Sequence, residues 1–422
     1  MVFSDTKITA LIRELLGERL RRQSADYTHV SVGFPHYDEH EILNALDSLL
    51  NIRISQGEKV AIFEKQFSRY VGTSFAVAVN SGTSANLLAI AALKEAHRIP
   101  DGAEVVVPAA TFSSVVSPII QLGLVPVYVD VDPRSWNINP REVARAIGKK
   151  TRILMPVHSF GNPADMPEIM RIARRSRLLV IEDCCEAHGA MIGRRHVGSF
   201  GDLSTLSFFV AHNITTGEGG MVFGNDPKLR TILTSLREFG RLPPEVSRQK
   251  RYVAYDRRLG YYDVRNTYVR LGYNVRMTDI AAALGIEQLK KLHRFNRLRI
   301  RIVATYRKGL APYQTVLDLP EVRRGTRHSF YGFPIIIKKN ASFSRRELVM
   351  YLETHGIETR SFFGGCLPDQ PAFRKAPGRV VGDLPVSRWI RDNGFFIGCH
   401  PALSPAHVRH VLETFAAFFS RR

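Results

Sequence analysis

Residues 75–86 read FAVAVNSGTSAN, and this stretch contains the change from strand to helix that the rest of the chain repeats. The apolar run 75–79 has the length of one buried strand. The polar turn that follows contains a glycine and leads into a helical pattern over about 85–96. Free N–H groups and the dipole at such a helix start suit a phosphate, so residues 81–85 are a candidate phosphate site. A helix cap without a ligand would give the same pattern.

The same alternation continues to residue 223. Further short apolar runs, with helical stretches between most of them, occur at 104–107, 126–129, 153–157, 178–182, 204–210 and 221–223. Buried apolar strands that alternate with helices favour an α/β fold, with a mainly parallel seven-stranded sheet covered on both faces. Ligands bind beyond the carboxyl ends of such strands, so site residues are expected there.

Three parts are predicted along the chain. They are an N-terminal helical segment over 1–50, a large α/β domain over 51–290, and a linker helix with a small C-terminal α+β domain over 291–422. The supporting patterns are helices at 4–22, 39–50, 61–70, 278–307, 345–354 and 405–419, and a strand at 329–338. Residues 241–269 are polar and rich in Arg and Tyr, so an irregular excursion is predicted there.

The formal net charge of the 422-residue chain is +20. Nucleic acid binding is not expected, because the basic residues are spread along the chain and are not interleaved with aromatic residues. A field that attracts phosphorylated small molecules is favoured, and an arginine-rich surface without a role is the alternative. No apolar run approaches the ~20 residues of a membrane span, and the charged N-terminus has no signal core. A cytoplasmic protein without a membrane partner is therefore expected.

The four cysteines are at positions 184, 185, 366 and 399. Adjacent cysteines have poor geometry for a disulfide, and no C-x-x-C spacing occurs. Neither a metal site nor a disulfide framework is predicted, and reduced, buried thiols are expected.

Two motifs at predicted strand ends contain residues that could bind an aromatic cofactor. Asp183 ends an apolar strand, where a carboxylate needs a partner such as a protonated pyridine nitrogen. A capping aspartate is the alternative. Phe112 could stack on an aromatic ring, although a core residue is the more common role of such a phenylalanine. His188 could be a core histidine or a substrate contact.

The stretch 207–220, SFFVAHNITTGEGG, contributes two more candidates. The hydroxyl of Ser207 can bond a phosphate, and His212 follows five residues later. A glycine-rich turn then leads to another apolar run.

Five blocks, SGTSAN, PxxTF, EDxxxAHG, TGEGG and GYNxRMTDI, together resemble the sugar aminotransferase (DegT/DnrJ/EryC1/StrS) family, which consists of fold-type I pyridoxal-phosphate (PLP) enzymes. The resemblance covers about residues 30–419 and implies that the large domain binds the cofactor. It implies that Gly82, Thr83 and Ser207 hold the cofactor phosphate.

The same resemblance implies that Phe112 stacks on the pyridine ring and that Asp183 pairs with its nitrogen. It also implies a homodimer with shared active sites, in which Asn274 reaches the cofactor of the partner subunit.

A smaller group of this family looks more similar still, the PMP-dependent 3-dehydratases of nucleotide-linked 4-keto-6-deoxyhexoses (PMP, pyridoxamine phosphate). That group has histidine where the aminotransferases have the Schiff-base lysine, and His212 stands at this position. Segments 119–126, 182–185 and 330–334 are similar to the group too, and a match near 359–371 suggests Arg360 as a substrate contact.

The resemblance implies a non-covalently bound PMP or PLP and a base of ordinary pKa, ~6.5, at His212. The implied reaction removes the C3 hydroxyl of a nucleotide-linked 4-keto-hexose or a related sugar nucleoside. Members of the group that work with a reductase hold a [2Fe–2S] cluster on four cysteines in the segment matching 238–270. This chain has no cysteine between positions 185 and 366, so the cluster ligands are absent and no reductase partner is strictly implied. Phe209 also stands where the group often has tyrosine.

Two alternatives remain open at this point. One is an aminotransferase with a displaced lysine, for which Lys228 and Lys250 are the nearest candidates. The other is a catalytically silent relative that keeps the fold. The intact pattern at Asp183 and Ser207 argues against a silent protein.

Overall fold

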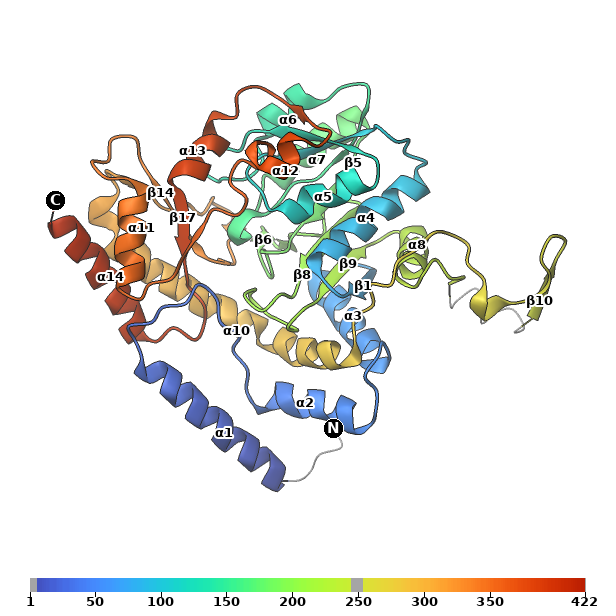
Figure 1. The fold of residues 1–422 in the computed structure, drawn as a ribbon, viewed down its shortest axis with the longest axis horizontal. Coiled ribbons are helices and arrows are strands. Elements are labelled where there is room, and N and C mark those ends of the chain that lie inside the picture. Colours follow the sequence, from blue (N-terminus) through green and yellow to red (C-terminus); the bar gives the residue numbers. More distant parts are fainter. Residues whose placement is uncertain (1–5, 244–252, 422) are drawn as a thin grey trace.

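A mixed eight-stranded sheet forms the centre of the computed structural model, which describes residues 6–243 and 253–421 (Figure 1). Its strand order is β1-β9-β8-β5-β4-β2-β3-β16. The bounds are β1 (Phe75–Val79), β9 (Gly220–Gly224), β8 (Leu203–Ser207), β5 (Leu179–Asp183), β4 (Thr151–Leu154), β2 (Glu104–Pro108), β3 (Val125–Val129) and β16 (Arg379–Val380).

The sheet is mainly parallel, as predicted. The pairs from β8 to β16 are all parallel, whereas β9 is antiparallel to both β1 and β8. All seven predicted strands are present. The prediction of seven strands omits β16, a two-residue edge strand from the C-terminal part of the chain. The predicted strand 204–210 ends at Ser207, where the chain turns into a loop beside the cavity described below.

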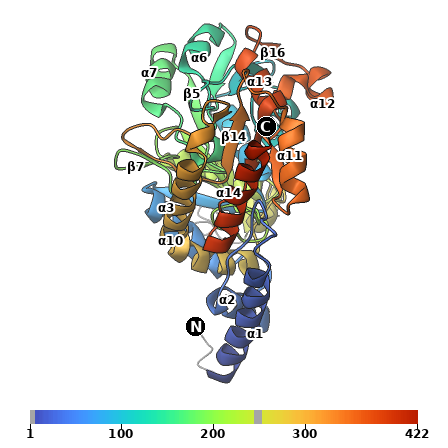
Figure 2. The same cartoon turned by 90° about the vertical axis from the view of Figure 1, so that its left-hand side faces the viewer.

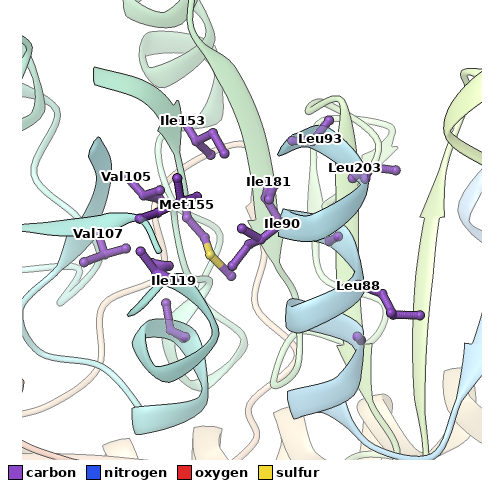
Figure 3. Packing of buried hydrophobic residues seen from close by; sticks show 14 of the residues in the cluster. Leu88, Ile90, Leu93, Val105, Val107, Ile119, Ile153, Met155, Ile181 and Leu203 are labelled. Atoms are coloured by element: carbon purple, nitrogen blue, oxygen red, sulfur yellow. The ribbon is translucent and has the colours of Figure 1, made fainter. Parts of the chain in front are cut away.

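Helices cover both faces of the sheet, because side chains alternate between the two faces along each strand. One face packs against α4 (Gly82–Ala96), α5 (Ser113–Gln121) and α8 (Pro227–Arg237). Figure 3 shows this layer, with Ile90 of α4 near Ile181 of β5. The other face packs against α3 (Glu58–Val71), α6 (Pro140–Ala146), α7 (Met166–Ser176) and α10 (Asp279–Gly309).

The long helix α10 joins the large sheet to a second, four-stranded sheet. At its start, the buried carboxylate of Asp279 accepts hydrogen bonds from the backbone N–H groups of Gly57, Lys59 and Val60 at the start of α3. The second sheet has the order β12-β14-β17-β15. Its elements are β12 (Leu317–Asp318), β14 (Phe333–Ile337), β15 (Thr359–Ser361), β17 (Gly394–Ile397), α11 (Arg345–Thr354), α13 (Pro385–Asn393) and α14 (Pro405–Ser420).

The N-terminal helices α1 (Thr6–Ala25) and α2 (Glu39–Leu50) lie together at one end of the molecule (Figures 1 and 2). Short elements complete the fold: β6 (Met191–Ile192), β7 (Arg195–His196), β13 (Thr326–Arg327) and α12 (Pro371–Arg374). No helix in the described ranges is long and apolar enough to cross a membrane.

The predicted excursion 241–269 is only partly irregular. It contains a projecting hairpin of β10 (Val253–Asp256) and β11 (Gly260–Asp263), and residues 244–252 of this prediction lie outside the described part of the chain. A composition rich in Arg and Tyr therefore does not exclude strands, because a two-stranded hairpin needs only local backbone pairing.

Candidate active site

A cavity of about 300 Å³ lies beyond the carboxyl ends of β2, β5 and β8. It contains most of the side chains that the sequence singles out. Those in its wall are Gly82, Thr83, Phe112, Asp183, Ser207 and His212. These residues come from four separate segments, which meet here because the strand ends share one edge of the sheet.

The first wall of the cavity is the start of α4. Ser81 caps the helix by accepting a hydrogen bond from the N–H of Ser84 at 3.1 Å. Gly82 and Thr83 begin the helix, where N–H groups have no partner within the helix. A Cβ added to Gly82 would lie 2.6 Å from the Cβ of Ser207, so only glycine permits this approach of α4 to β8. The resulting cradle of helix N-terminus and serine hydroxyl fits a phosphate.

Asp183 lies at the floor of the cavity and is 3% exposed. Its carboxylate accepts hydrogen bonds from the Asn86 side chain at 2.9 Å and from the Cys185 backbone at 3.0 Å. Within the described chain no Lys, Arg or His forms an ion pair with it. An oriented, buried carboxylate without a cationic partner fits a protonated pyridine nitrogen.

Phe112 lies at the start of α5 and is 55% exposed, so it is not a core residue. Its ring is in the cavity wall with that of Phe363. An exposed aromatic ring beside Asp183 and the cradle is available to stack on a planar cofactor.

His212 is half-buried in the loop that follows β8. The centroid of its ring lies 5.1 Å from that of Tyr331, 5.5 Å from that of His188 and 6.3 Å from that of Phe209. Burial, and next the positive charge of Arg299, lower the pKa of His212 to about 3. The expectation of an ordinary pKa is therefore wrong for this environment, and the imidazole is neutral at pH 7.

Three further predicted residues lie outside the cavity of their own chain. His188 is 1% exposed beneath His212, and burial lowers its pKa well below the usual value. Arg360 lies on β15, where it pairs with the carboxylate of Glu358 and donates to the carbonyl of Thr359. The structure therefore does not bring either residue into contact with the cavity. The amide oxygen of Asn274 accepts a hydrogen bond from Arg276 at 3.1 Å, and its role in a partner's site stays a prediction.

Several residues at the cavity were not predicted to have a role. Asn86, on the buried face of α4, orients Asp183. Glu186 accepts a hydrogen bond from the Phe160 N–H at 2.5 Å, and burial raises its pKa well above the usual value. Burial also raises the pKa of Tyr331, so its hydroxyl stays protonated. Asn86, Glu186 and Tyr331 all lie inside the blocks and segments named above, but only their surroundings in the fold indicate these roles.

No lysine of the described chain lies in the cavity wall. Lys228 is in the first turn of α8, and Lys250 lies outside the described residues. All four cysteines are free, and only Cys185 reaches the cavity.

One buried group of metal-binding residue types occurs in the described chain, at His158, Glu182 and Cys184. The carboxylate of Glu182 is already occupied by His158 at 3.2 Å and by three backbone N–H groups of residues 198–201. The second ring nitrogen of His158 accepts the N–H of Ala164. This cluster is a structural hydrogen-bond network behind β5.

Comparison with known proteins identifies relatives along nearly the whole chain. The sequence profile of the DegT/DnrJ/EryC1/StrS aminotransferase family matches residues 35–416. A dTDP-4-dehydro-2,6-dideoxy-D-glucose 3-dehydratase of Saccharopolyspora spinosa is 37% identical over 395 residues, covering 91% of this chain and 85% of that protein. A GDP-perosamine synthase of Caulobacter vibrioides is 33% identical over 389 residues, covering 92% and 98%.

A solved structure has the same fold. E. coli GDP-4-keto-6-deoxy-D-mannose-3-dehydratase with bound hydrated PLP superposes with a TM-score of 0.82 at 29% identity. The superposition covers 92% of this chain and 99% of that one.

Proposed function

The chain belongs to the DegT/DnrJ/EryC1/StrS aminotransferase family and is a PLP-dependent, sugar-modifying enzyme of fold type I; from this premise we propose that it is a 3-dehydratase. Its substrate in this proposal is a nucleotide-linked 4-keto-hexose or a related sugar nucleoside, and it removes the C3 hydroxyl. The observation that carries the proposal is His212 in the cavity wall, at the position where the aminotransferases of the family have lysine.

The residues of the cavity divide into those that hold the cofactor and those that move a proton. The start of α4 and Ser207 hold the phosphate, Phe112 stacks on the ring, and Asp183 pairs with the ring nitrogen. When bound as the amine, the cofactor supplies a conjugated electron acceptor next to the sugar keto group. Imidazole forms no Schiff base, so His212 leaves that amine free.

His212 acts as the base in this proposal. A neutral imidazole accepts a proton, and the low pKa of His212 keeps it neutral across the physiological range. The rings of Tyr331 and Phe209 lie next to its side chain. No cysteine occurs between positions 185 and 366, so the proposal includes neither an iron–sulfur cluster nor a reductase partner.

The substrate and the dimer follow from charge and from the family. A net charge of +20 attracts a phosphorylated sugar carrier. In the homodimer that we propose, Asn274 of one subunit contributes to the cavity of the other, and it is not in the wall of the cavity of its own chain.

A sugar aminotransferase is the second candidate, and one observation favours it. The GDP-perosamine synthase of C. vibrioides matches this chain over as much of its length as the 3-dehydratase does. An aminotransferase of this type needs an amine that binds PLP covalently, and the described cavity wall has no lysine.

The test is incubation of the protein and PMP with a panel of CDP-, GDP- and TDP-linked 4-keto sugars, followed by mass spectrometry. Loss of water supports the dehydratase, whereas transfer of the amino group without loss of water supports the aminotransferase. A protein that binds neither PMP nor PLP is the silent relative.

A variant pair tests the role of His212. His212→Asn is expected to bind PMP but to abolish exchange of the cofactor C4′ proton with solvent. His293→Asn, on the exposed side of α10, is the matched control and is expected to behave like the wild type. Full turnover by His212→Asn would refute the assignment.

A further inference from the structure

Arg299 is a buried guanidinium that forms no ion pair with a carboxylate of the described residues. It lies on α10 and is 1% exposed. One of its terminal nitrogens donates to the carbonyls of Phe330 at 3.1 Å and Tyr331 at 2.9 Å, and lies 4.0 Å from the sulfur of Cys399. Its Nε is buried without a hydrogen-bond partner, and it forms no ion pair with any described Asp or Glu. Since a buried charge is costly unless it is paired, this arrangement calls for a functional reason.

The guanidinium lies behind the imidazole of His212. His212 lines the main cavity, and it also lines a second, small cavity together with Arg299, His36, Gln288 and Asn213. The two carbonyls that Arg299 binds belong to the segment that carries Tyr331, whose ring packs against His212.

Among the described residues that line the two cavities together with His212, Arg299 is the one Lys or Arg. The groups that face His212 from the second cavity are Arg299 and His36, and burial lowers the pKa of His36. From the main cavity they are Asp183, Cys185, Glu186, Glu218 and Tyr331, and His188 lies beneath the ring. Burial shifts the pKa of Cys185, Glu186, Tyr331 and His188 in the direction that favours their neutral forms.

We infer that Arg299 is a positioning residue for His212: its uncompensated charge favours the neutral imidazole, and its hydrogen bonds hold Tyr331 against the ring. The charge also makes the imidazolium a better proton donor once His212 has taken up a proton.

The effect of Arg299 on the imidazolium as a proton donor rests on the proposed function and suits a dehydration. As the C3–O bond breaks, its electron pair leaves with the oxygen, and the proton carried by His212 completes a water molecule. A base that holds its proton weakly returns it within the same turnover.

The test is the pKa of His212 in protein without substrate, measured by NMR on histidine-labelled samples. The signal is assigned by its loss in His212→Asn. In the wild type His212 is expected to titrate below pH 5. Arg299→Met removes the charge and is expected to raise this pKa by about one unit or more. Arg299→Lys keeps the charge and is expected to leave it near the wild-type value.

Each outcome decides the inference. A wild-type pKa of 5 or above overturns it without any substitution, and this measurement stands even if Arg299→Met fails to fold. A pKa that is unchanged in Arg299→Met, or raised equally in Arg299→Met and Arg299→Lys, also overturns it. Because no sugar is present, failure here leaves the dehydratase proposal standing. If none of the 4-keto sugars in the panel reacts, the titration of His212 still tests the role of Arg299.

Discussion

Substitution of Gly82 by alanine is expected to weaken cofactor binding and to lower the stability of a protein that still folds. A Cβ at this position would lie 2.6 Å from the Cβ of Ser207, 3.1 Å from its Oγ and 3.2 Å from the Sγ of Cys185. Non-bonded carbon atoms rest at about 3.5–4.0 Å. The start of α4 and the end of β8 must therefore separate by on the order of 1 Å, and both belong to the phosphate cradle.

Two free energies set the size of the effect. Overpacking of a close contact destabilises a protein by about 1–3 kcal/mol. A hydrogen bond to a charged group contributes about 1.5–3 kcal/mol, so loss of one bond to the phosphate weakens binding by roughly 10- to 100-fold. The expected result for Gly82→Ala is thus a folded protein of lower melting temperature whose Kd for PMP rises by that factor.

Calorimetric titration with PMP and a thermal melt measure the two terms separately. Gly148→Ala is the control, because its added Cβ would meet only the Glu104 carboxylate, at 3.9 Å. An affinity for PMP in Gly82→Ala within twofold of the wild type would refute the phosphate site at the start of α4. A fall in affinity in both variants would mean that the effect is not specific to the cradle.

Three other predictions test the polar groups around the site and the core. Asn86→Leu removes the side-chain hydrogen bonds to Asp183 and to the carbonyl of Ser114. This variant should have a free energy of unfolding that is lower by about 2 kcal/mol in urea denaturation, and it should bind PMP more weakly. Unchanged values for both would contradict the role of Asn86. His328 and His400 are buried, and burial lowers the pKa of each from 6.5 to about 3. Because the unfolded chain binds these protons more readily, the stability they contribute is present above pH 6.5 and is lost as the pH falls toward 3. Each of these two histidines should lower the free energy of unfolding by about 2 kcal/mol as the pH falls from 7.5 to 5. A free energy of unfolding that stays constant over this pH range would contradict the prediction. His212→Lys should bind PLP covalently, and borohydride reduction should then increase the mass of the peptide that contains position 212. The wild type should show no labelled peptide. A labelled peptide elsewhere in the wild-type chain would restore the aminotransferase with a displaced lysine.

Elements with a strong local pattern could be predicted from the sequence. The helices over 39–50 and 345–354 have the predicted bounds, because apolar spacing and capping residues are adjacent in the chain. The edge strand β16 could not be predicted. Its two residues pair with β3, which is about 250 positions away, and nothing in residues 379–380 themselves indicates that partner.

Some residues of the candidate site could be predicted from the sequence, and others could not. Gly82, Asp183 and Ser207 follow predicted strands or start a predicted helix, so their meeting at one edge of the sheet could be predicted from the order of the elements. His188 and Arg360 also stand in matching segments, yet one is enclosed by the core and the other pairs with a neighbouring carboxylate. The pattern alone does not distinguish these cases.

The sequence by itself determined the α/β architecture and the residue types of the cavity, because both depend on periodicity and on the order of strand ends along the chain. The proton affinity of His212 was decided only by tertiary structure. Burial of its ring, and the charge that Arg299 brings from a helix 87 positions further along the chain, lower its pKa to about 3. Desolvation and Coulomb forces act across space, so a residue's neighbours in sequence do not report them.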